Sequence, residues 1–286
     1  MVDRSLQKCI RDNCLYFKNP DILNHAGGEY CCKRCKHAGE HGPLCKRRLI
    51  PNTAIQGKFT LESISVYIFN WKKVSENSLK LYENINKVIS DITIVNCDEK
   101  LKLNSAIKNI QLDDTHYYGS QYEHAIKDVK DNKILCVIVG DNIANNAFKD
   151  IFKNTVCLFN KYKVGVYGPH DKRSPHKKFY NMVEDKVFNI KNTDCGFWFI
   201  NPEIVKIFKP YNFKNLSPYG WGIDVITINE SRRLGYKVLS DFRVETDQID
   251  HTTNYNAATA IKKQHNLIAK YNNQTTDLHR NCTPNG

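Results

Sequence analysis

Two aspartates follow closely after the ends of short apolar runs, where their side chains could do chemistry. Asp141 and Asn142 follow, after one glycine, the run over residues 134–139. Asp98 follows a second apolar run over residues 91–95. A carboxylate at such a point can hold a divalent metal that in turn binds a diphosphate, and another can accept a hydrogen bond from a base or a ribose. Turns that only close two strands explain the same residues, so both interpretations stay open.

A third aspartate follows a glycine-rich turn. The stretch Gly220-Trp221-Gly222 precedes Asp224 by two positions. An aspartate side chain ordinarily has a pKa of ~3.9, so it is ionised at neutral pH and can accept a proton from a hydroxyl group. The glycines leave room for a ligand to approach Trp221 closely, and indole faces commonly stack on sugar rings. The alternative interpretation is a core tryptophan within a turn.

An α/β sheet would position these residues. The run Ile134–Val139 is apolar without alternation, which is typical of a strand buried on both faces of a mixed or parallel sheet. Ligands of such sheets bind outside the carboxyl ends of the strands, where Asp141 falls. The other expected elements are strands over residues 63–71, 91–95 and near 110, and helices over 71–90, 119–129, 225–234 and 256–269.

The sequence lacks the motifs of two common nucleotide sites. No Gly-x-Gly-x-x-Gly follows the first expected strand, so a nicotinamide-binding fold would lack its pyrophosphate cradle. No Walker lysine motif is present either. The remaining common way to hold a diphosphate in such a fold is an acidic, metal-bridged loop at a strand end. Asp141 could supply that acid.

Composition places the chain among globular proteins. It has 286 residues, 41% of them hydrophobic and 25% charged, which is enough to bury a core in one or two domains. The net charge of +12 suits an anionic partner. No apolar run approaches the ~20 residues of a membrane span, and the N-terminus lacks the apolar segment of a signal peptide. We therefore expect a cytoplasmic protein in a reducing compartment.

The first 45 residues are rich in cysteine, and the second half of this segment, from Cys31 to Cys45, resembles a treble-clef or FCS-like zinc finger. Six of the eleven cysteines fall within the first 45 residues, at spacings that suit a tetrahedral zinc site, although free buried thiols are the alternative. Because so small a segment has few apolar residues, bound Zn²⁺ would supply the folding energy. The zinc candidates are Cys14, Cys32, Cys35, His41 and Cys45.

Residues 60 to 256 resemble glycosyltransferases of the GT-A fold. Val-Gly-Asp141-Asn142 stands in the place of their Asp-x-Asp motif, although only one acid is present. The stretch from Asn192 to Ile200 is similar to their acceptor-side strand. The segment from Trp221 to Asp224 is similar to the segment that supplies the base in inverting members, and Asp241 and His251 follow the pattern of a C-terminal metal-binding histidine. With its cysteine module the chain is also similar to glycosyltransferase-like proteins of giant DNA viruses, which implies the host cytoplasm or the virion as its location.

The resemblance implies an enzyme, its site and its partners. It implies an inverting glycosyltransferase that takes a UDP- or GDP-type nucleotide sugar and a glycan or protein acceptor. Asp224 would be the general base, and Asp141 with His251 would hold Mn²⁺ or Mg²⁺. The residues expected to bind the nucleotide sugar are Asp98, Asp141, Asn142, Trp221 and Gly222.

The expected organisation is a zinc module over residues 1–50, a linker over 51–58, a GT-A-like domain over 59–255, and a C-terminal helix and polar tail over 256–286. The fold class is therefore α/β, a Rossmann-type mixed sheet flanked by helices. The rival interpretation is a zinc-containing nucleic-acid-binding protein whose α/β domain is catalytically idle. The acidic and aromatic turn from Trp221 to Asp224 suits a phosphate backbone poorly, so nucleic acid is not the expected partner.

Overall fold

The computed structural model describes residues 59–143, 147–173, 179–249 and 256–280. Residues 57–269 form one compact unit, and the fold and the site described below belong to it. The predicted zinc ligands Cys14, Cys32, Cys35, His41 and Cys45, and the predicted metal ligand His251, lie outside the described residues.

Ten strands of the described chain form one mixed sheet, whose main path runs β3-β2-β1-β4-β9-β6-β10-β8-β7. The first four strands on this path are parallel, and β9 is antiparallel to both of its neighbours. The bounds are β1 Ile64–Asn70, β2 Ile92–Asn96, β3 Asn109–Gln111, β4 Ile134–Val139, β5 Asn142–Ile143, β6 Val164–Asp171, β7 Phe179–Glu184, β8 Val187–Ile190, β9 Phe197–Ile200 and β10 Lys237–Gln248.

The central position of β4 explains its sequence. All six residues of the strand are buried, and β4 lies between β1 and β9. Because both of its faces are covered, every position is apolar, as the unbroken run predicted. β1 and β2 are also buried along their whole length and pair in parallel, as the strand–helix–strand order predicted.

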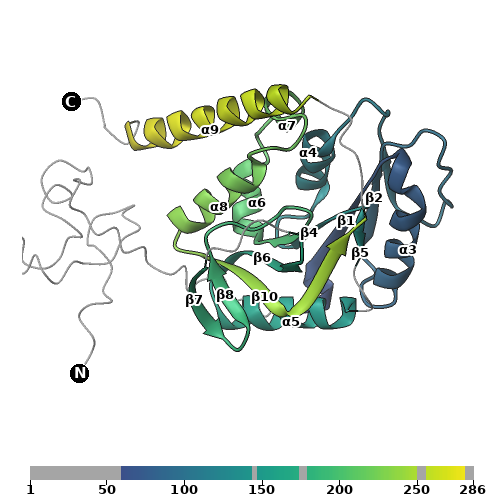
Figure 1. Cartoon of the computed structure of the whole chain (residues 1–286), viewed down its shortest axis with the longest axis horizontal. Coiled ribbons are helices and arrows are strands. Elements are labelled where there is room, and N and C mark those ends of the chain that lie inside the picture. The colour runs from purple at the N-terminus through teal and green to yellow at the C-terminus, as the bar shows by residue number, and fades with distance from the viewer. Residues whose placement is uncertain (1–58, 144–146, 174–178, 250–255, 281–286) are drawn as a thin grey trace, which may run out of the picture. The chain divides into compact units, whose positions relative to one another are not determined.

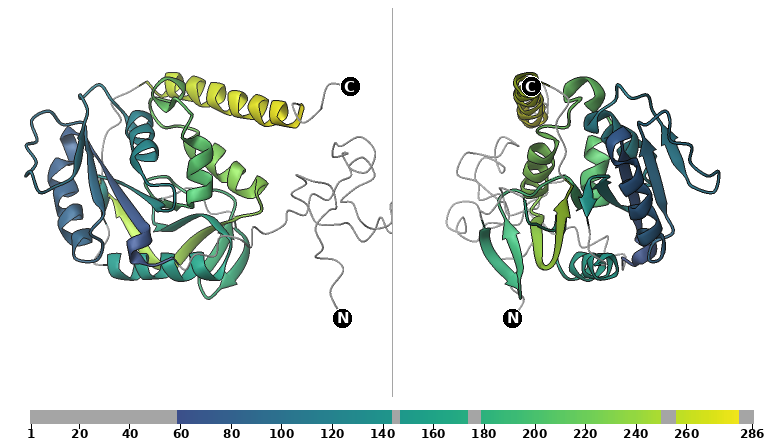
Figure 2. Two further views of the ribbon diagram at one scale, coloured as in Figure 1. Left: turned by 180° about the vertical axis from the view of Figure 1, so that it is seen from behind. Right: turned by 45° about the vertical axis from the view of Figure 1, so that its right-hand side comes forward.

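Helices cover both faces of the sheet (Figures 1 and 2). On one face α3 packs against β1 and β2, and α5 packs against β6. On the other face lie α4, α6 and α8, which contact β1, β4 and β6 respectively. The helix bounds are η4 Leu61–Ser63, η5 Lys72–Val74, α3 Ser75–Asn86, α4 Tyr118–Asp128, α5 Phe148–Lys161, α6 Pro202–Phe208, α7 Phe213–Leu216, α8 Ile223–Arg233 and α9 Ala257–Arg280.

The predicted fold class is confirmed: this is an α/β domain with a mixed sheet flanked by helices. Several elements were not expected from the sequence, namely α5, β6, the β7–β8 hairpin, α6, α7 and β10. None of the described helices is both long enough and apolar enough to span a bilayer.

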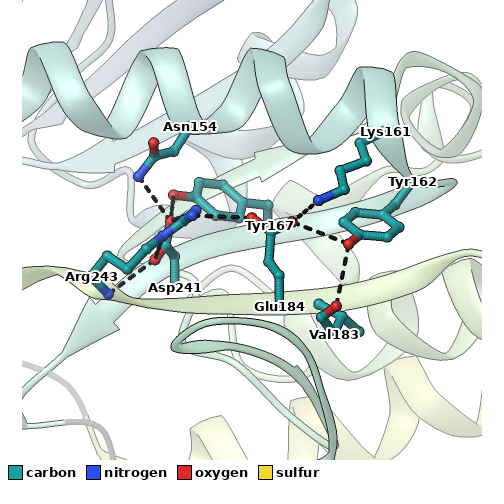
Figure 3. Close-up of polar contacts among 8 residues, drawn as sticks. All are labelled: Asn154, Lys161, Tyr162, Tyr167, Val183, Glu184, Asp241 and Arg243. Atoms are coloured by element: carbon teal, nitrogen blue, oxygen red, sulfur yellow. Dashed lines mark hydrogen bonds and ion pairs between the residues drawn. The ribbon is translucent and has the colours of Figure 1, made fainter.

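The buried Asp241 forms an ion pair with the partly exposed Arg243 at a bend in β10 (Figure 3). The register of β10 against β6 shifts between Asp241 and Glu245. Asp241 is fully buried, and its carboxylate accepts hydrogen bonds from Arg243 Nε at 2.8 Å and Nη2 at 2.7 Å. Tyr167 Oη and Asn154 Nδ2 also donate to it, at 3.1 and 3.0 Å. The pair therefore links β10 to β6 and α5 at the bend.

The bend directs the second half of β10 toward the end of β4. There Gln248 pairs with Asn142 of β5, and the backbone N–H of Ile249 donates to the carbonyl of Asp141 at 2.8 Å. The resemblance associated Asp241 with a metal-binding pattern. In the structure its carboxylate is engaged by Arg243, so Asp241 has a structural role.

Candidate functional site

A cleft of about 1110 Å³ lies at the carboxyl edge of the parallel strands. Its floor is formed where β1, β2 and β4 end, at Trp71, Cys97 and Asp141. Because β9 runs antiparallel to β4, the residues just before β9 reach the same edge. The start of α8 supplies another wall. A site of this size fits a small-molecule ligand.

Asp141 lies at the floor of the cleft, separated from the end of β4 by Gly140. The Gly140 N–H donates to the Phe69 carbonyl of β1 at 2.8 Å, which ties this turn to the neighbouring strand. The Asp141 residue is 3% exposed, and its backbone carbonyl accepts from Ile249. The carboxylate therefore belongs to a well-packed turn at the floor of the cleft.

Asp194 is a second acid that lines the cleft, and it was not among the site residues predicted from the sequence. It precedes β9, and its Oδ1 accepts from the Gly196 N–H at 3.2 Å. The Val139 N–H of β4 in turn donates to the Gly196 carbonyl at 2.7 Å. Asp194 and Asp141 thus stand at the ends of paired strands. Only the antiparallel pairing of β9 with β4, which the sequence does not reveal, brings them to one edge.

A buried acid lies behind Asp194. Asp171, at the end of β6, accepts from Gln248 Nε2 at 2.6 Å and from the Arg173 N–H at 2.8 Å. Burial raises the pKa of Asp171, and the nearby charges of Asp194 and Asp247 raise it further. Gln248 itself lines the cleft, so its contact with Asp171 fixes one polar side chain of the wall.

The turn before α8 needs its two glycines. Gly220 has φ +86° and Gly222 has φ +89°, a left-handed conformation that residues with a Cβ rarely adopt. A Cβ on Gly220 would also stand 2.4 Å from the Tyr118 ring. This conformation places the partly buried Trp221 on the cleft wall.

Asp224 occupies the first turn of α8 and lines the same cleft. The predicted helix over 225–234 is present, beginning two residues earlier at Ile223. Unpaired backbone N–H groups at a helix start favour a negative charge nearby. The structure therefore presents an acidic side chain to the cleft from the first turn of a helix.

Aromatic side chains from α4 support this turn. The Tyr118 hydroxyl donates to the Cys195 carbonyl at 2.9 Å. Burial raises the pKa of Tyr118 well above its ordinary value, and Cys195 and Asp224 add to the effect. Tyr118 therefore stays protonated and remains a donor. Tyr117 and Tyr219 lie with ring centroids 5.1 Å apart, so α4 and the turn form one continuous wall.

Two predicted site residues lie behind the wall rather than on it. Asp98 follows β2 as expected, but it is 7% exposed and accepts from Ser75 Oγ at 2.7 Å and from the Lys100 N–H at 3.0 Å. Asn142 is 1% exposed, and its Nδ2 donates to the Gly196 carbonyl at 3.0 Å. The structure brings Asp141, Trp221, Gly222 and Asp224 together at the cleft. The side chains of Asp98 and Asn142 are instead buried and hydrogen-bonded within the domain.

The described residues offer few metal ligands. Within them, no three His, Cys, Asp or Glu side chains are grouped so that they could hold a metal ion. Among the described residues that line the cleft, the cations are Lys72 and Lys73, which follow β1, and His116 lines it as well. Two basic residues that follow β6 form ion pairs with acids of β10: Lys172 with Glu245 and Arg173 with Asp247.

Comparison with known proteins gave one kind of match. No family model and no curated protein matches the sequence. Among solved structures, the chain is similar to the crystal structure of GalNAc-T7 with UDP, GalNAc and Mn²⁺, at a TM-score of 0.47 and 11% sequence identity. The match covers 66% of this chain and 43% of that chain, so this chain spans less than half of that protein's length.

Proposed function

We propose that the chain is a glycosyltransferase that moves a sugar from a UDP- or GDP-type nucleotide sugar to a hydroxyl group of a glycan or protein. One observation carries the proposal: Asp141 and Asp224, far apart in the sequence, line one cleft at the carboxyl edge of the sheet together with Trp221. A diphosphate needs a counter-charge and an acceptor hydroxyl needs a base. The cleft provides a place for both.

The position of the cleft in the sheet supports a nucleotide ligand. From β1 the chain goes to β2 and β3 on one side, and then to β4 on the other side. This reversal creates a crevice outside the ends of β1 and β4, the usual ligand site of open α/β sheets. Trp71 and Asp141 stand at those two strand ends.

The proposed reaction is a single displacement that inverts the anomeric carbon. Asp224 takes the proton from the acceptor hydroxyl while that oxygen forms a bond to the anomeric carbon. The bond between the anomeric carbon and the diphosphate oxygen breaks, and the electron pair leaves with the nucleoside diphosphate. Trp221 lies beside Asp224 on the cleft wall, where its indole would hold a sugar ring against the base.

Asp141 fits a divalent metal. Mg²⁺ is often held by one or two carboxylates and by the phosphates of the substrate, so one protein carboxylate at this point is compatible with such a site. Bound Mn²⁺ or Mg²⁺ would neutralise the charge that develops on the departing diphosphate. The backbone at Ile249 is hydrogen-bonded to Asp141. His251, two residues further along the sequence, remains a predicted second ligand.

Asp141→Asn tests the metal role. Because it removes a charge-assisted contact worth about 1.5–3 kcal/mol, the affinity for UDP or GDP in Mn²⁺ should fall roughly ten- to a hundredfold. Isothermal titration with Mn²⁺ and with excess chelator measures this change. Asp150→Asn, an exposed carboxylate in the first turn of α5, is the matched control. Equal affinity of wild type and Asp141→Asn, unchanged by chelator, would rule the metal role out.

Ligand-induced melting separates the enzyme from its rival. A ligand that binds only the folded state raises the melting temperature by an amount that grows with the logarithm of the ligand concentration relative to its Kd. Stabilisation of the full chain by a nucleoside diphosphate with Mn²⁺ would support the proposed function. Absence of that stabilisation, combined with salt-sensitive retention on DNA or RNA, would favour the zinc-containing nucleic-acid-binding protein instead.

The N-terminal module is proposed from sequence alone. The spacings of Cys14, Cys32, Cys35, His41 and Cys45 support a structural Zn²⁺ within residues 1–50. We expect about one zinc ion per chain in the purified protein, and a lower melting temperature for Cys35→Ala. Metal analysis well below one zinc per chain, or unchanged melting of the variant, would refute this part of the proposal.

A further inference from the structure

The three most exposed large apolar side chains of the described residues all lie on β7. Their exposed fractions are 45% for Phe179, 59% for Tyr180 and 60% for Met182. β7 is the last strand at one end of the sheet and, within the described residues, pairs with β8 alone. Single apolar residues are common on protein surfaces, but a contiguous group on one strand indicates a surface that contacts a partner.

The hairpin of β7 and β8 holds this apolar group in place at the end of the sheet (Figures 1 and 2). The ring centroid of Phe179 lies 4.8 Å from that of Phe188 on β8 and 5.4 Å from that of Phe242 on β10. The Phe242 N–H donates to the carbonyl of Lys186 in the hairpin turn at 2.8 Å. The exposed surface is therefore formed before a partner binds, which lowers the entropic cost of binding.

Three cations lie on or beside the hairpin. Lys186 in the turn and Lys191 after β8 are both exposed. The guanidinium carbon of Arg232, on α8, lies 5.4 Å from the centroid of the Tyr180 ring. Its Nη2 donates to the carbonyl of Ile190 at 2.6 Å and to the carbonyl of Lys191. In the part of the chain that the structure describes, none of these three cations forms an ion pair with a carboxylate.

The acids of the hairpin do not offset this charge. The Glu184 carboxylate, at the end of β7, pairs with Lys161 at 2.5 Å and with Arg243 at 3.0 Å, so its charge is already compensated. Asp185 is the acid of the turn and is exposed. The surface therefore combines apolar side chains with an excess of positive charge, as the whole chain does with its net charge of +12.

We infer that this surface docks the protein on an anionic lipid membrane. It is called the hairpin patch below and consists of Phe179, Tyr180, Met182, Lys186, Lys191 and Arg232. Apolar and aromatic side chains would enter the boundary between headgroups and acyl chains, while the cations contact anionic headgroups. The free edge of β7 has backbone polar groups that need hydrogen-bond partners, so docking stops at the depth of the headgroups. The inference does not depend on the proposed function.

A second copy of the chain fits this surface less well. The register of β7 against β8 is irregular at two places, between Phe179 and Asn181 and between Met182 and Glu184. Irregular edge strands resist pairing with the edge of another sheet. In a symmetric pair the same patch faces itself, so the unpaired cations of the two copies would repel each other.

Nucleic acid fits less well too. Binding of single strands relies on ring faces that are free to stack on bases. Arg232 covers one face of Tyr180, and the Phe179 ring packs against Phe188 and Phe242. Met182, the most exposed member of the patch, has no ring. An apolar and cationic surface of this kind matches a lipid interface better than a stack of bases.

Cosedimentation with vesicles tests the inference on the full chain. We expect binding to vesicles of phosphatidylcholine with phosphatidylserine, weaker binding at high salt, and little binding to phosphatidylcholine alone. Met182→Ser should weaken binding roughly three- to tenfold, because it removes exposed apolar surface. Lys186→Asn and Lys191→Gln should each weaken it about fivefold, the usual effect of one cation at an anionic surface. Asparagine suits position 186 because the backbone there has φ +53°.

Two variants outside the patch are the matched controls. Ile261→Ser removes an apolar side chain that is 42% exposed on α9, and Lys153→Gln removes an exposed cation of α5. Both should bind vesicles as the wild type does. Because every change is at an exposed side chain, all variants should keep the wild-type melting temperature, which melting curves check.

The outcomes decide between the possible partners. Vesicle binding that the patch variants lose and the controls keep supports the inference. A wild-type protein that does not bind the anionic vesicles, or patch variants that bind them as tightly as the wild type, overturns it. A wild-type dimer in sedimentation velocity that Met182→Ser converts to a monomer, without vesicle binding, would assign the patch to a second copy. Retention on RNA that the patch variants lose, again without vesicle binding, would assign it to nucleic acid. Either result overturns the inference.

Discussion

Asp224→Asn should lower sugar transfer by roughly 10²- to 10⁴-fold, the usual contribution of a general base. The amide preserves the shape of the side chain and its hydrogen bonding but cannot take the acceptor proton at neutral pH. Nucleotide affinity should change little, because Asp224 faces the cleft from α8 whereas the diphosphate is assigned to the β4 side. Release of nucleoside diphosphate, with water or a glycan as acceptor, measures the rate, and titration measures the affinity.

The control for this variant is Asp150→Asn. Asp150 also lies in the first turn of a helix but is exposed on α5, so it reports any general effect of losing a carboxylate at a helix start. A variant Asp224→Asn that transfers sugar at nearly the wild-type rate would make Asp224 a structural residue. Loss of nucleotide binding together with transfer would place it among the donor contacts.

Asp241→Ala should lower the free energy of unfolding by about 1–3 kcal/mol, as expected when buried hydrogen-bonding groups lose their partner. The substitution leaves Arg243, Tyr167 and Asn154 without the acceptor that they share (Figure 3). Arg243 keeps a contact with Glu184 at 3.0 Å, which favours the lower part of this range. Urea denaturation followed by circular dichroism measures the change.

A variant at the exposed rim of the same network provides the comparison. Lys161 pairs with Glu184 at 2.5 Å, but its side chain is 54% exposed. Lys161→Met should therefore cost less than about 1 kcal/mol. If Asp241→Ala and Lys161→Met destabilise the protein equally little, the ion pair of Asp241 with Arg243 does not stabilise the bend of β10. Because that bend carries Gln248 to the cleft, Asp241→Ala should also weaken nucleotide binding.

The sequence predicted the elements whose environment is uniform along their length. β4 is buried on both faces, so its apolar run identified it, and the glycine before Asp141 marked the strand end. The turn before α8 was recognisable because Gly220 and Gly222 are required by its left-handed backbone. Asp141, Trp221 and Asp224 could therefore be proposed together before their common cleft was known.

Features that depend on distant pairing could not be predicted in this way. Asp98 looks like a ligand-binding acid at a strand end, but its partner Ser75 lies on another element. Asp194 reaches the cleft because β9 is antiparallel to β4, a relation that no local pattern encodes. The long strand β10 was not expected because its pattern is interrupted at the bend, where the buried Asp241 looks like a surface residue in the sequence.

Turnover of a nucleotide sugar tests the central claim most directly. The full chain is incubated in Mn²⁺ with a panel of UDP- and GDP-sugars, and the release of nucleoside diphosphate is measured for the wild type and for Asp141→Asn. We predict that at least one donor is turned over many times per protein molecule and that Asp141→Asn abolishes most of this activity. Release from no donor, with no change in melting temperature on addition of any of them, would contradict the assignment of this cleft to a glycosyltransferase.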